Sequence, residues 1–443
     1  MIFISLSLAA FLFMRHDVTF AVMLGMFWPR FILICIITQL NLYFRDLYQF
    51  KTTESGVDLT NRLLQAIAGA SITLAIIYFL WPKMLIGKWV FFTSVAFLLL
   101  LLVSWRLLYS LVIRKKLFTE PAVILGSGEL AQAILHEINN RKDIPYRINL
   151  IVAAQHTEEI DDQWKKIPVR YGFDGISKLD EDEKIESIIV ALDEKRGILP
   201  YKELLQCKLK GMKIIDGESM YERISGKLMV EKLNPSFLIF SDGFVKSNVS
   251  TAIKKSTDLL LASIMLVLFS PIMLLVALAI KLDSSGPVFF SQERVGKFGK
   301  LYSLHKFRSM RADAEDGTGP VWAAEDDPRI TRVGRVIRRV RIDEFPQLWN
   351  VLKGEMSFVG PRPERLAFVE KLKKKIPYYN ERLTVEPGIT GWAQIKYPYG
   401  ASEKDALEKL KYDLYYIKNR SLIMDFIIMF HTAKAVVLGR GAR

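Results

Sequence analysis

The chain has 443 residues, a formal net charge of +14 and 51% hydrophobic residues. This length fits two or three domains, and the hydrophobic share exceeds that of typical soluble chains, which indicates that part of the chain lies in lipid. Cys35 and Cys207 lie far apart in the sequence, so neither a disulfide framework nor a cysteine metal site is supported. The positive charge suits an anionic membrane surface and phosphate-bearing ligands; we expect no nucleic-acid partner, because no nucleic-acid-binding motif is present.

Apolar runs dominate residues 1–116, for which we expect a transmembrane region of four helices. The runs Leu63–Trp81 and Trp89–Val112 each approach the ~20 residues that cross a bilayer. The run Trp28–Tyr48 carries charges near its ends, which suit membrane interfaces. The run Met1–Met14 is short, and we interpret it as a shortened first span, because a signal peptide would have a basic start and a cleavage site of small residues.

Basic residues predict the orientation of these spans. Four spans place both ends of the region on one side of the membrane. Arg114, Lys115 and Lys116 follow the last span, and further basic residues lie between the second and third spans. Because cytoplasmic loops carry an excess of Lys and Arg, we expect this side to be the cytoplasm.

Residues 118–244 show a soluble α/β pattern that predicts a Rossmann-like domain. The buried-strand candidate Ala122–Leu125 is followed by the turn Gly126–Gly128 and an amphipathic helix. Further strands are predicted at 150–153, 187–192 and 213–215. A dinucleotide site would need an acid directly after the second strand, but the first acid there is Glu158. We therefore expect a degenerate nucleotide-binding domain with a structural or regulatory role.

Residues 249–443 form the third predicted domain, whose first element is an apolar run at about 259–280. This run is long enough to span a bilayer, so a fifth transmembrane helix is one interpretation. Ser270 and Pro271 interrupt it, and the proline removes a backbone hydrogen bond, so the helix could bend there and return to the face it entered. The sequence alone leaves both open. Ser421–Val437 predicts an interfacial helix.

The adjacent acids Asp343 and Glu344 are the strongest candidate for a catalytic site. Pro346 and the apolar residues after it predict a helix that ends near Gly354, with Asp343 as its N-cap. Upstream, Arg329, Arg332, Arg335 and Arg338 recur every three residues, and Arg362 lies between two prolines. These residues have two interpretations. One is a surface helix capped by an acid, beside arginines that face water or lipid headgroups. The other is a catalytic site for phosphate chemistry, which carboxylates among fixed guanidinium groups favour.

At this point the sequence resembles the bacterial polyprenyl-phosphate phosphoglycosyltransferases of the large monotopic type. The matching motifs include Gly286–Phe290 with Gln292–Gly296, Lys306–Met310, Asp327–Gly334, the acid pair with its flanks, and Pro387–Gln394. The chain departs from many members at Arg341-Ile342 and at Tyr397–Gly400. These departures resemble an exopolysaccharide subgroup associated with exosortase systems, and they leave the sugar open.

The resemblance implies a mainly α monotopic catalytic domain with a re-entrant helix. It implies transfer of a sugar-1-phosphate from a UDP-sugar to undecaprenyl phosphate, with Asp343 as nucleophile and Glu344 as ligand of Mg²⁺. The candidate phosphate ligands are Lys306, Arg308, Arg329 and Arg362. The implied location is the bacterial inner membrane, with the catalytic domain on the cytoplasmic face and downstream glycosyltransferases as partners. Whether the chain forms a homodimer stays open.

Two other classes of protein are the alternatives. A membrane-anchored nucleotide-sugar dehydratase or epimerase needs a Tyr-x-x-x-Lys pair in its Rossmann domain, but this spacing occurs only from Tyr302 to Lys306, outside that domain. A non-catalytic scaffold of a polysaccharide assembly complex would not need the intact acid pair. An assay of UMP release separates a scaffold from an enzyme.

Overall fold

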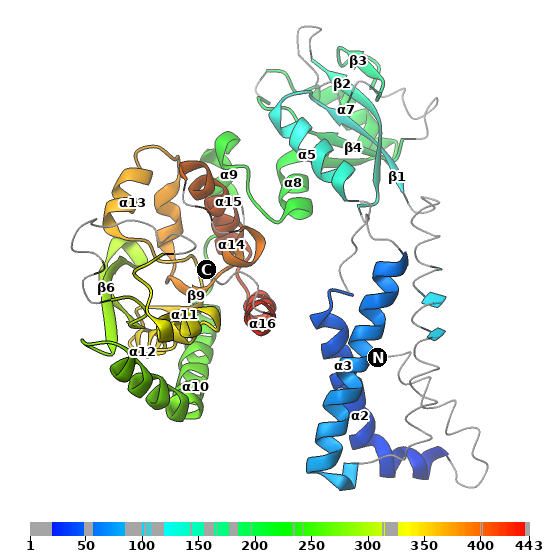
Figure 1. Ribbon diagram of the computed structural model, residues 1–443. Helices are drawn as coiled ribbons and strands as arrows, with labels where there is room; N and C mark the ends of the chain where they lie inside the picture. Colours follow the sequence, from blue (N-terminus) through cyan, green and yellow to red (C-terminus); the bar gives the residue numbers. More distant parts are fainter. Residues whose placement is uncertain are drawn as a thin grey trace.

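A computed structural model shows helices and a parallel sheet at one end of the chain and a mainly helical region at the other (Figure 1). It describes residues 20–47, 56–84, 119–141, 144–154, 166–176, 185–195, 197–233, 235–241, 243–311, 327–398 and 402–438, with residues 100, 101, 104, 105, 108, 164, 314 and 400. The structural statements below concern these residues.

Two long helices form the described part of the N-terminal region. Helices α2 (Phe20–Phe44) and α3 (Gly56–Leu80) have 25 residues each and pack against one another through small and aliphatic side chains such as Ile37 and Ala70. A short η1 (Pro82–Met84) follows. By length and composition, Thr60–Leu80 could cross a membrane. The predicted spans at 1–14 and 89–112 lie outside the described residues, apart from a few positions of the latter, so four spans stay a prediction.

The middle region contains a five-stranded parallel sheet in the order β3-β2-β1-β4-β5, which confirms the predicted α/β pattern. Side chains of β1 alternate between two cores: Ala122 and Ile124 face one layer, and Val123 and Leu125 face the other. The sequence did not predict β3, which has only three residues. The elements are β1 (Glu120–Leu125), α5 (Glu129–Asn140), β2 (Tyr146–Ala153), β3 (Val169–Tyr171), β4 (Ser187–Val190), α7 (Tyr201–Leu209), β5 (Lys213–Asp216) and α8 (Gly217–Ser225).

The C-terminal region is mainly helical, as predicted, and packs around one core that includes Leu348, Val351 and Leu414. A β6–β7 hairpin and a short parallel β8–β9 pair complete it. After η4 (Val230–Lys232) and α9 (Pro235–Phe240) come α10 (Asn248–Asp283), β6 (Phe289–Val295), η5 (Lys297–Gly299), β7 (Leu301–Phe307), α11 (Arg332–Arg339), η6 (Ile342–Glu344), α12 (Gln347–Leu352), β8 (Ser357–Val359), α13 (Leu366–Leu372), η7 (Tyr379–Thr384), β9 (Gly388–Thr390), α14 (Trp392–Lys396), α15 (Glu403–Asn419) and α16 (Leu422–Val437).

Helix α10 is continuous through Pro271 and has 36 residues, so it is longer than the predicted apolar run and shows no break in its helical backbone. Pro271 has no N–H to offer the carbonyl of Val267, and the hydroxyl of Ser270 donates to that carbonyl instead, at 2.8 Å. Figure 1 shows α10 changing direction along its length. The helix can therefore bend at Pro271 without an unsatisfied backbone group, because the hydroxyl of Ser270 bonds the carbonyl of Val267.

Both arms of α10 lie against the C-terminal region. In the first arm, Lys254 donates to Asp425 of α16 at 2.7 Å, and Asp258 accepts from Ser357 of β8 at 2.8 Å. In the second arm, Ile280 packs with Phe307 of β7 and Ile337 of α11. A straight helix of this length would carry its two ends about 54 Å apart. Contacts of both ends with one compact region are the geometry of a helix that turns back.

Candidate active site

The acid pair lies in η6, one short turn before α12. Arg341 precedes it with a φ of 55°, in the left-handed region, which is uncommon for a residue with a side chain. Asp343 is not the predicted N-cap: η6 separates it from α12, whose N-cap position is held by Pro346. The predicted helix end is confirmed, because α12 stops at Leu352 and Gly354 has a φ of 77°. The tight turn holds both acids in a buried position.

Three cations surround the carboxylate of Glu344. Lys306 Nζ on β7 lies 3.0 Å from Glu344 Oε1, and Arg362 Nη2 lies 3.1 Å from the same oxygen. Arg341 Nη1 lies 3.9 Å from Oε2. Burial opposes the charged form of Glu344, but attraction to these cations outweighs it and holds the pKa of Glu344 below its ordinary value. Glu344 is therefore a fixed anion.

Asp343 has the opposite environment. Within the part of the chain that the structure describes, its carboxyl group has no hydrogen bond and no ion pair, and it is nearly as buried as Glu344. Burial raises the pKa of Asp343 to about 6; the charge of Lys306 opposes this rise and the charge of Glu344 adds to it. A buried carboxylate without a partner is poorly stabilised and correspondingly reactive, which suits a nucleophile.

Contacts with other elements position Lys306 and Arg362, the two cations that pair with Glu344. Asn350 of α12 accepts from His305 N at 3.1 Å and donates to Ser303 O at 2.7 Å, which fixes β7 and thus Lys306. The buried Arg382 donates to the carbonyl of Arg362 at 3.0 Å and pairs with Asp413 of α15 at 2.9 Å. The site is therefore preorganised by contacts from several elements.

The structure brings together some of the predicted phosphate ligands and separates others. Lys306 and Arg362, two of the predicted phosphate ligands, meet at Glu344. Arg308 instead donates to the carbonyls of Ser284 and Ser285, after α10, and is itself buried. Arg329 pairs with Asp327 and donates to Ala314 O. In this structure, both of these arginines support loops.

Arg338 and Arg341 belong to the site although the sequence did not single them out. Arg341 approaches Glu344, and the charge of Arg338 on α11 lowers the pKa of Asp343 against the effect of burial. The sequence feature that pointed to them was the arginine repeat upstream of the acid pair. Spacing marks such residues as neighbours on a helix, but it does not show which of them face the acids.

The acid pair also lies beside the bend of α10. The ring of Phe345, next to Glu344, lies 5.0 Å from the ring of Phe269, which directly precedes Ser270 and Pro271. Beyond this contact, α10 exposes many large aliphatic side chains, among them Val267, Leu274 and Leu275. The site therefore combines buried charges with an adjoining apolar surface, an arrangement that suits a substrate with a lipid chain and a phosphate.

The acid pair fits a Mg²⁺ ion that also binds substrate. In the described part of the chain, no group of three or more His, Cys, Asp or Glu residues could hold a metal by itself. Mg²⁺ commonly takes one or two carboxylates and completes its shell with substrate phosphates and water. Oε2 of Glu344, whose nearest cation is at 3.9 Å, offers such a donor.

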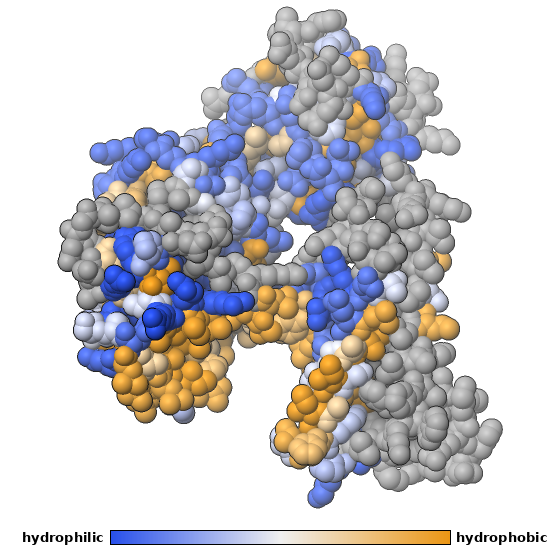
Figure 2. All heavy atoms as spheres, viewed as in Figure 1, coloured by the Kyte–Doolittle hydropathy of each residue, from blue (hydrophilic) through white to orange (hydrophobic). Residues whose placement is uncertain are grey.

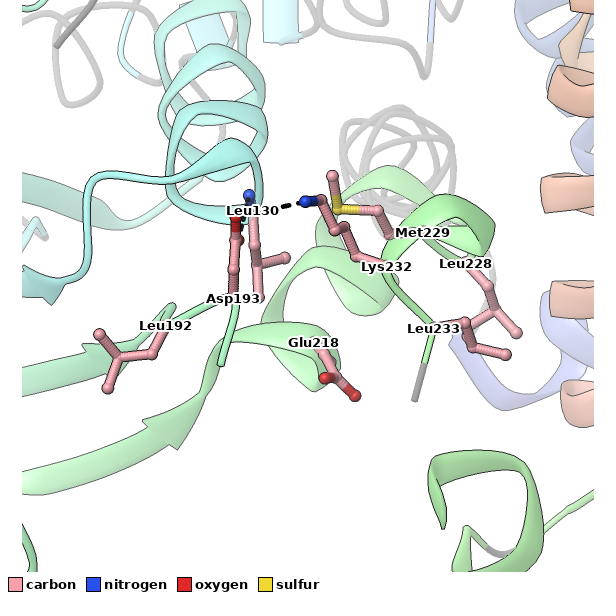
Figure 3. Close-up of a pocket in the computed structure, with 8 residues that line it drawn as sticks. All are labelled: Leu130, Leu192, Asp193, Glu218, Leu228, Met229, Lys232 and Leu233. Carbon is pink, nitrogen blue, oxygen red and sulfur yellow. Dashed lines mark hydrogen bonds and ion pairs between the residues drawn. The ribbon is translucent and has the colours of Figure 1, made fainter. Parts of the chain in front are cut away.

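The glycine turn of the middle region contains a carboxylate of the chain itself. Asp193, after β4, accepts from Glu129 N and Leu130 N at the start of α5, each at 3.2 Å. Lys232 Nζ lies 3.7 Å from Asp193, and Figure 3 shows both side chains beside α5. A Cβ on Gly128 would meet Asp193 Oδ2 at 2.4 Å, so the glycine allows this approach. Asp193 thus takes the place where a dinucleotide would put its phosphates.

Two family models match different parts of the chain. The bacterial sugar transferase family model matches residues 249–439, and a CoA-binding domain model matches residues 43–197. The UDP-N-acetylgalactosamine-undecaprenyl-phosphate N-acetylgalactosaminephosphotransferase of Aeromonas hydrophila is 43% identical over 240 residues, covering 54% of this chain and 56% of that protein. The undecaprenyl-phosphate glucose phosphotransferase of Komagataeibacter xylinus is 34% identical over 333 residues, covering 72% and 59%.

A shorter relative is matched over most of its length. The exopolysaccharide production protein PSS of Rhizobium leguminosarum bv. phaseoli is 42% identical over 185 residues, which cover 41% of this chain and 92% of that protein. The matches to the two larger relatives span little more than half of their lengths.

Proposed function

Because the chain belongs to the bacterial sugar transferase family, the polyprenyl-phosphate phosphoglycosyltransferases, we propose that it transfers a sugar-1-phosphate from a UDP-sugar to undecaprenyl phosphate. The products are undecaprenyl-diphosphate sugar and UMP, in the first membrane step of exopolysaccharide biosynthesis. The observation that carries this proposal is the buried acid pair, with one acid fixed by cations and the other without a partner, beside an exposed apolar helix.

In the first half-reaction, an oxygen of the Asp343 carboxylate attacks the sugar-side phosphorus of the UDP-sugar. The bond from that phosphorus to the bridging oxygen breaks, and its electron pair leaves with UMP. In the second, a phosphate oxygen of the lipid attacks the same phosphorus, and Asp343 leaves as a carboxylate. One site therefore serves a soluble and a lipid substrate in turn.

The cations explain why the two acids have different roles. Lys306 and Arg362 keep Glu344 ionised and can also bind the oxygens around the transferred phosphorus. Glu344 would hold Mg²⁺ together with the diphosphate, and the ion would offset the substrate's negative charge. Arg338 and Arg341 add positive charge on the other side of the pair.

The same proposal covers the location of the protein. We place it in the bacterial inner membrane as a multi-pass protein with four N-terminal spans and its C-terminal region on the cytoplasmic face, where UDP-sugars are made. Helix α10 would enter and leave on that face, as the contacts of both its arms support. Downstream glycosyltransferases would extend the product. The middle region would be structural, since Asp193 already occupies its anion-binding turn; a homodimer stays a prediction.

The test is an assay of UMP release by the purified protein with undecaprenyl phosphate, Mg²⁺ and a panel of UDP-hexoses and UDP-N-acetylhexosamines. We expect release with at least one sugar, dependent on the lipid acceptor for multiple turnovers. Absence of UMP release with every sugar would favour a scaffold. Conversion of the nucleotide sugar without UMP or lipid would favour a dehydratase or epimerase.

The roles of the two acids are tested by trapping. With radiolabelled UDP-sugar and no lipid acceptor, wild-type protein should retain label, and Asp343→Asn should retain none and lose turnover by at least about a thousandfold. Glu344→Gln should weaken Mg²⁺ dependence and keep slow transfer at high Mg²⁺, because a carboxamide oxygen remains a weak ligand. Labelling lost only in Glu344→Gln would reverse the two roles.

A further inference from the structure

Helix α11 has two charged faces with different surroundings. On the inner face, Ile337 is buried against Ile280 of α10, and Arg338 acts on Asp343. The outer face is exposed and carries basic and apolar residues at helical spacing: Arg332, Arg335, Val336, Arg339 and Val340. Val336 is 63% exposed and Val340 39% exposed. The outer face therefore presents two valines among three arginines.

This outer face continues the apolar surface of α10. Asp283, the last residue of α10, accepts from Val333 N of α11 at 3.0 Å. Val333 and the α10 residues Met273 and Ala277 pack against the same buried cluster. The same arm of α10 exposes Leu274, Leu278 and Leu282. Figure 2 shows strongly hydrophilic spheres directly bordering the hydrophobic surface at the lower end of the C-terminal region. A band of positive charge therefore adjoins the surface expected to enter lipid.

We propose that the outer face of α11 is a docking surface for the headgroups of anionic phospholipids. Guanidinium groups bind phosphate oxygens in pairs, and the valines can enter the boundary between headgroups and acyl chains. The lipid substrate has the same phosphate chemistry, but its phosphate must reach Asp343, and the arginine of α11 whose charge acts on Asp343 is the half-buried Arg338. This proposal rests on the proposed function in one respect, the location of α10 in the membrane.

Docking of α11 on the membrane would affect the reaction through Arg338. Because Arg338 and the outer arginines share one rigid helix, a headgroup bound outside fixes the position of Arg338 relative to the acid pair. Bilayers with anionic lipid should therefore support faster turnover than neutral bilayers. Arg332, Arg335 and Arg339 are in this sense positioning residues, which need not touch the substrate.

The first experiment measures contact with lipid without measuring activity. In the full chain, Val336→Cys is labelled with bimane, and Cys35 and Cys207 are buried. The protein is placed in nanodiscs of phosphatidylcholine with or without phosphatidylglycerol, and a nitroxide is attached to the lipid near its headgroup. We expect stronger quenching when phosphatidylglycerol is present. Adding Arg335→Gln and Arg339→Gln should remove this difference, whereas the control Lys202→Gln with Lys208→Gln, on the exposed face of α7, should retain it.

The second experiment measures UMP release in the same discs. The pair Arg335→Gln and Arg339→Gln should abolish the stimulation by phosphatidylglycerol and leave turnover in neutral discs close to wild type. A raised KM for undecaprenyl phosphate in neutral discs would overturn the proposal, since the arginines would then serve the lipid substrate. Equal labelling of Val336→Cys by a soluble maleimide in all discs, with no quenching, would also overturn it. Failure of the proposed function would appear separately, as no UMP release by wild type.

Discussion

Asp343 and Glu344 are neighbours in one turn, yet their surroundings separate their chemistry. Glu344 shares one oxygen between Lys306 and Arg362, so its charge is stable but strongly engaged. Asp343 is also buried but has no such partner among the described residues, so burial raises its pKa. Pairs of acids whose environments push their pKa values apart commonly divide the work of a reaction, which supports our proposal that Asp343 is the nucleophile.

The raised pKa of Asp343 predicts a pH dependence for the covalent step. An acid whose pKa is raised to about 6 is mostly protonated below that pH, and a protonated carboxyl group cannot attack phosphorus. Formation of labelled enzyme from UDP-sugar in a single turnover should therefore fall as pH drops from 8 to 5, with half of the rate lost near pH 6.

This pH profile is measured without lipid acceptor, because the phosphate of the lipid also titrates in this range and would obscure the result. Asp343→Asn serves as a control for stability. It removes a poorly stabilised buried charge, so its thermal midpoint above pH 6 should not fall below that of wild type. A rate of labelling that stays flat from pH 5 to pH 8 would contradict the assignment of Asp343.

At the residue scale, the sequence could identify the acid pair and two of its cations but not all contacts. Lys306 and Arg362 lie in motifs that the family resemblance marked, and they meet at Glu344. Arg308 also lies in such a motif, but its partners are backbone carbonyls, which sequence does not distinguish. Asp343 was wrongly expected to be an N-cap, because propensity alone did not predict the left-handed Arg341 and the extra turn η6.

At the scale of elements, α10 shows what hydropathy does and does not predict. The apolar run marked its membrane-facing part, but the helix begins earlier, at Asn248, where Ser247 caps it by accepting from Ser250 N. Hydropathy also could not decide whether the helix spans or bends back, since Pro271 is compatible with both. The contacts of both arms with one region favour a helix that bends back, and sequence does not show such tertiary contacts.

A bent α10 predicts that both of its ends face the same side of the membrane. Asn248→Cys and Ser285→Cys replace exposed residues at the two ends. In oriented vesicles, a membrane-impermeant maleimide should label both from the cytoplasmic face, because the bend at Pro271 returns the second arm to the face where the first began. The reference for labelling from the cytoplasmic face is Lys202→Cys on α7, in the region that contains the five-stranded sheet. Labelling of the two ends from opposite faces would show that α10 spans the bilayer.

At the scale of the whole molecule, polar contacts join the three parts of the chain. Glu222 of α8 pairs with Lys418 of α15 at 2.6 Å, and Trp392 of α14 donates to Gly226 O at 2.8 Å. These contacts hold the sheet-containing region to the catalytic one. They join residues 196 and 166 positions apart in the sequence. Sequence patterns predicted the parts but not these contacts, since no local periodicity connects residues at that separation.

The N-terminal helices are joined to the catalytic region through Lys434 of α16. Its ammonium group pairs with Asp46, donates to Tyr43 O at 2.6 Å and lies 4.6 Å from the centre of the Tyr43 ring. Both charged side chains are buried, so Lys434→Met removes the ammonium group that pairs with the buried carboxylate of Asp46 and should destabilise the protein by about 3 kcal/mol. The exposed pair of Lys371 and Glu403 is a matched control, and Lys371→Met should cost less than about 1 kcal/mol. Thermal unfolding in nanodiscs, with Asp46→Leu as the second arm of a double-mutant cycle, measures the coupling. Equal effects of Lys434→Met and Lys371→Met, or additive effects of Lys434→Met and Asp46→Leu, would show that this pair does not hold the helices to the catalytic region.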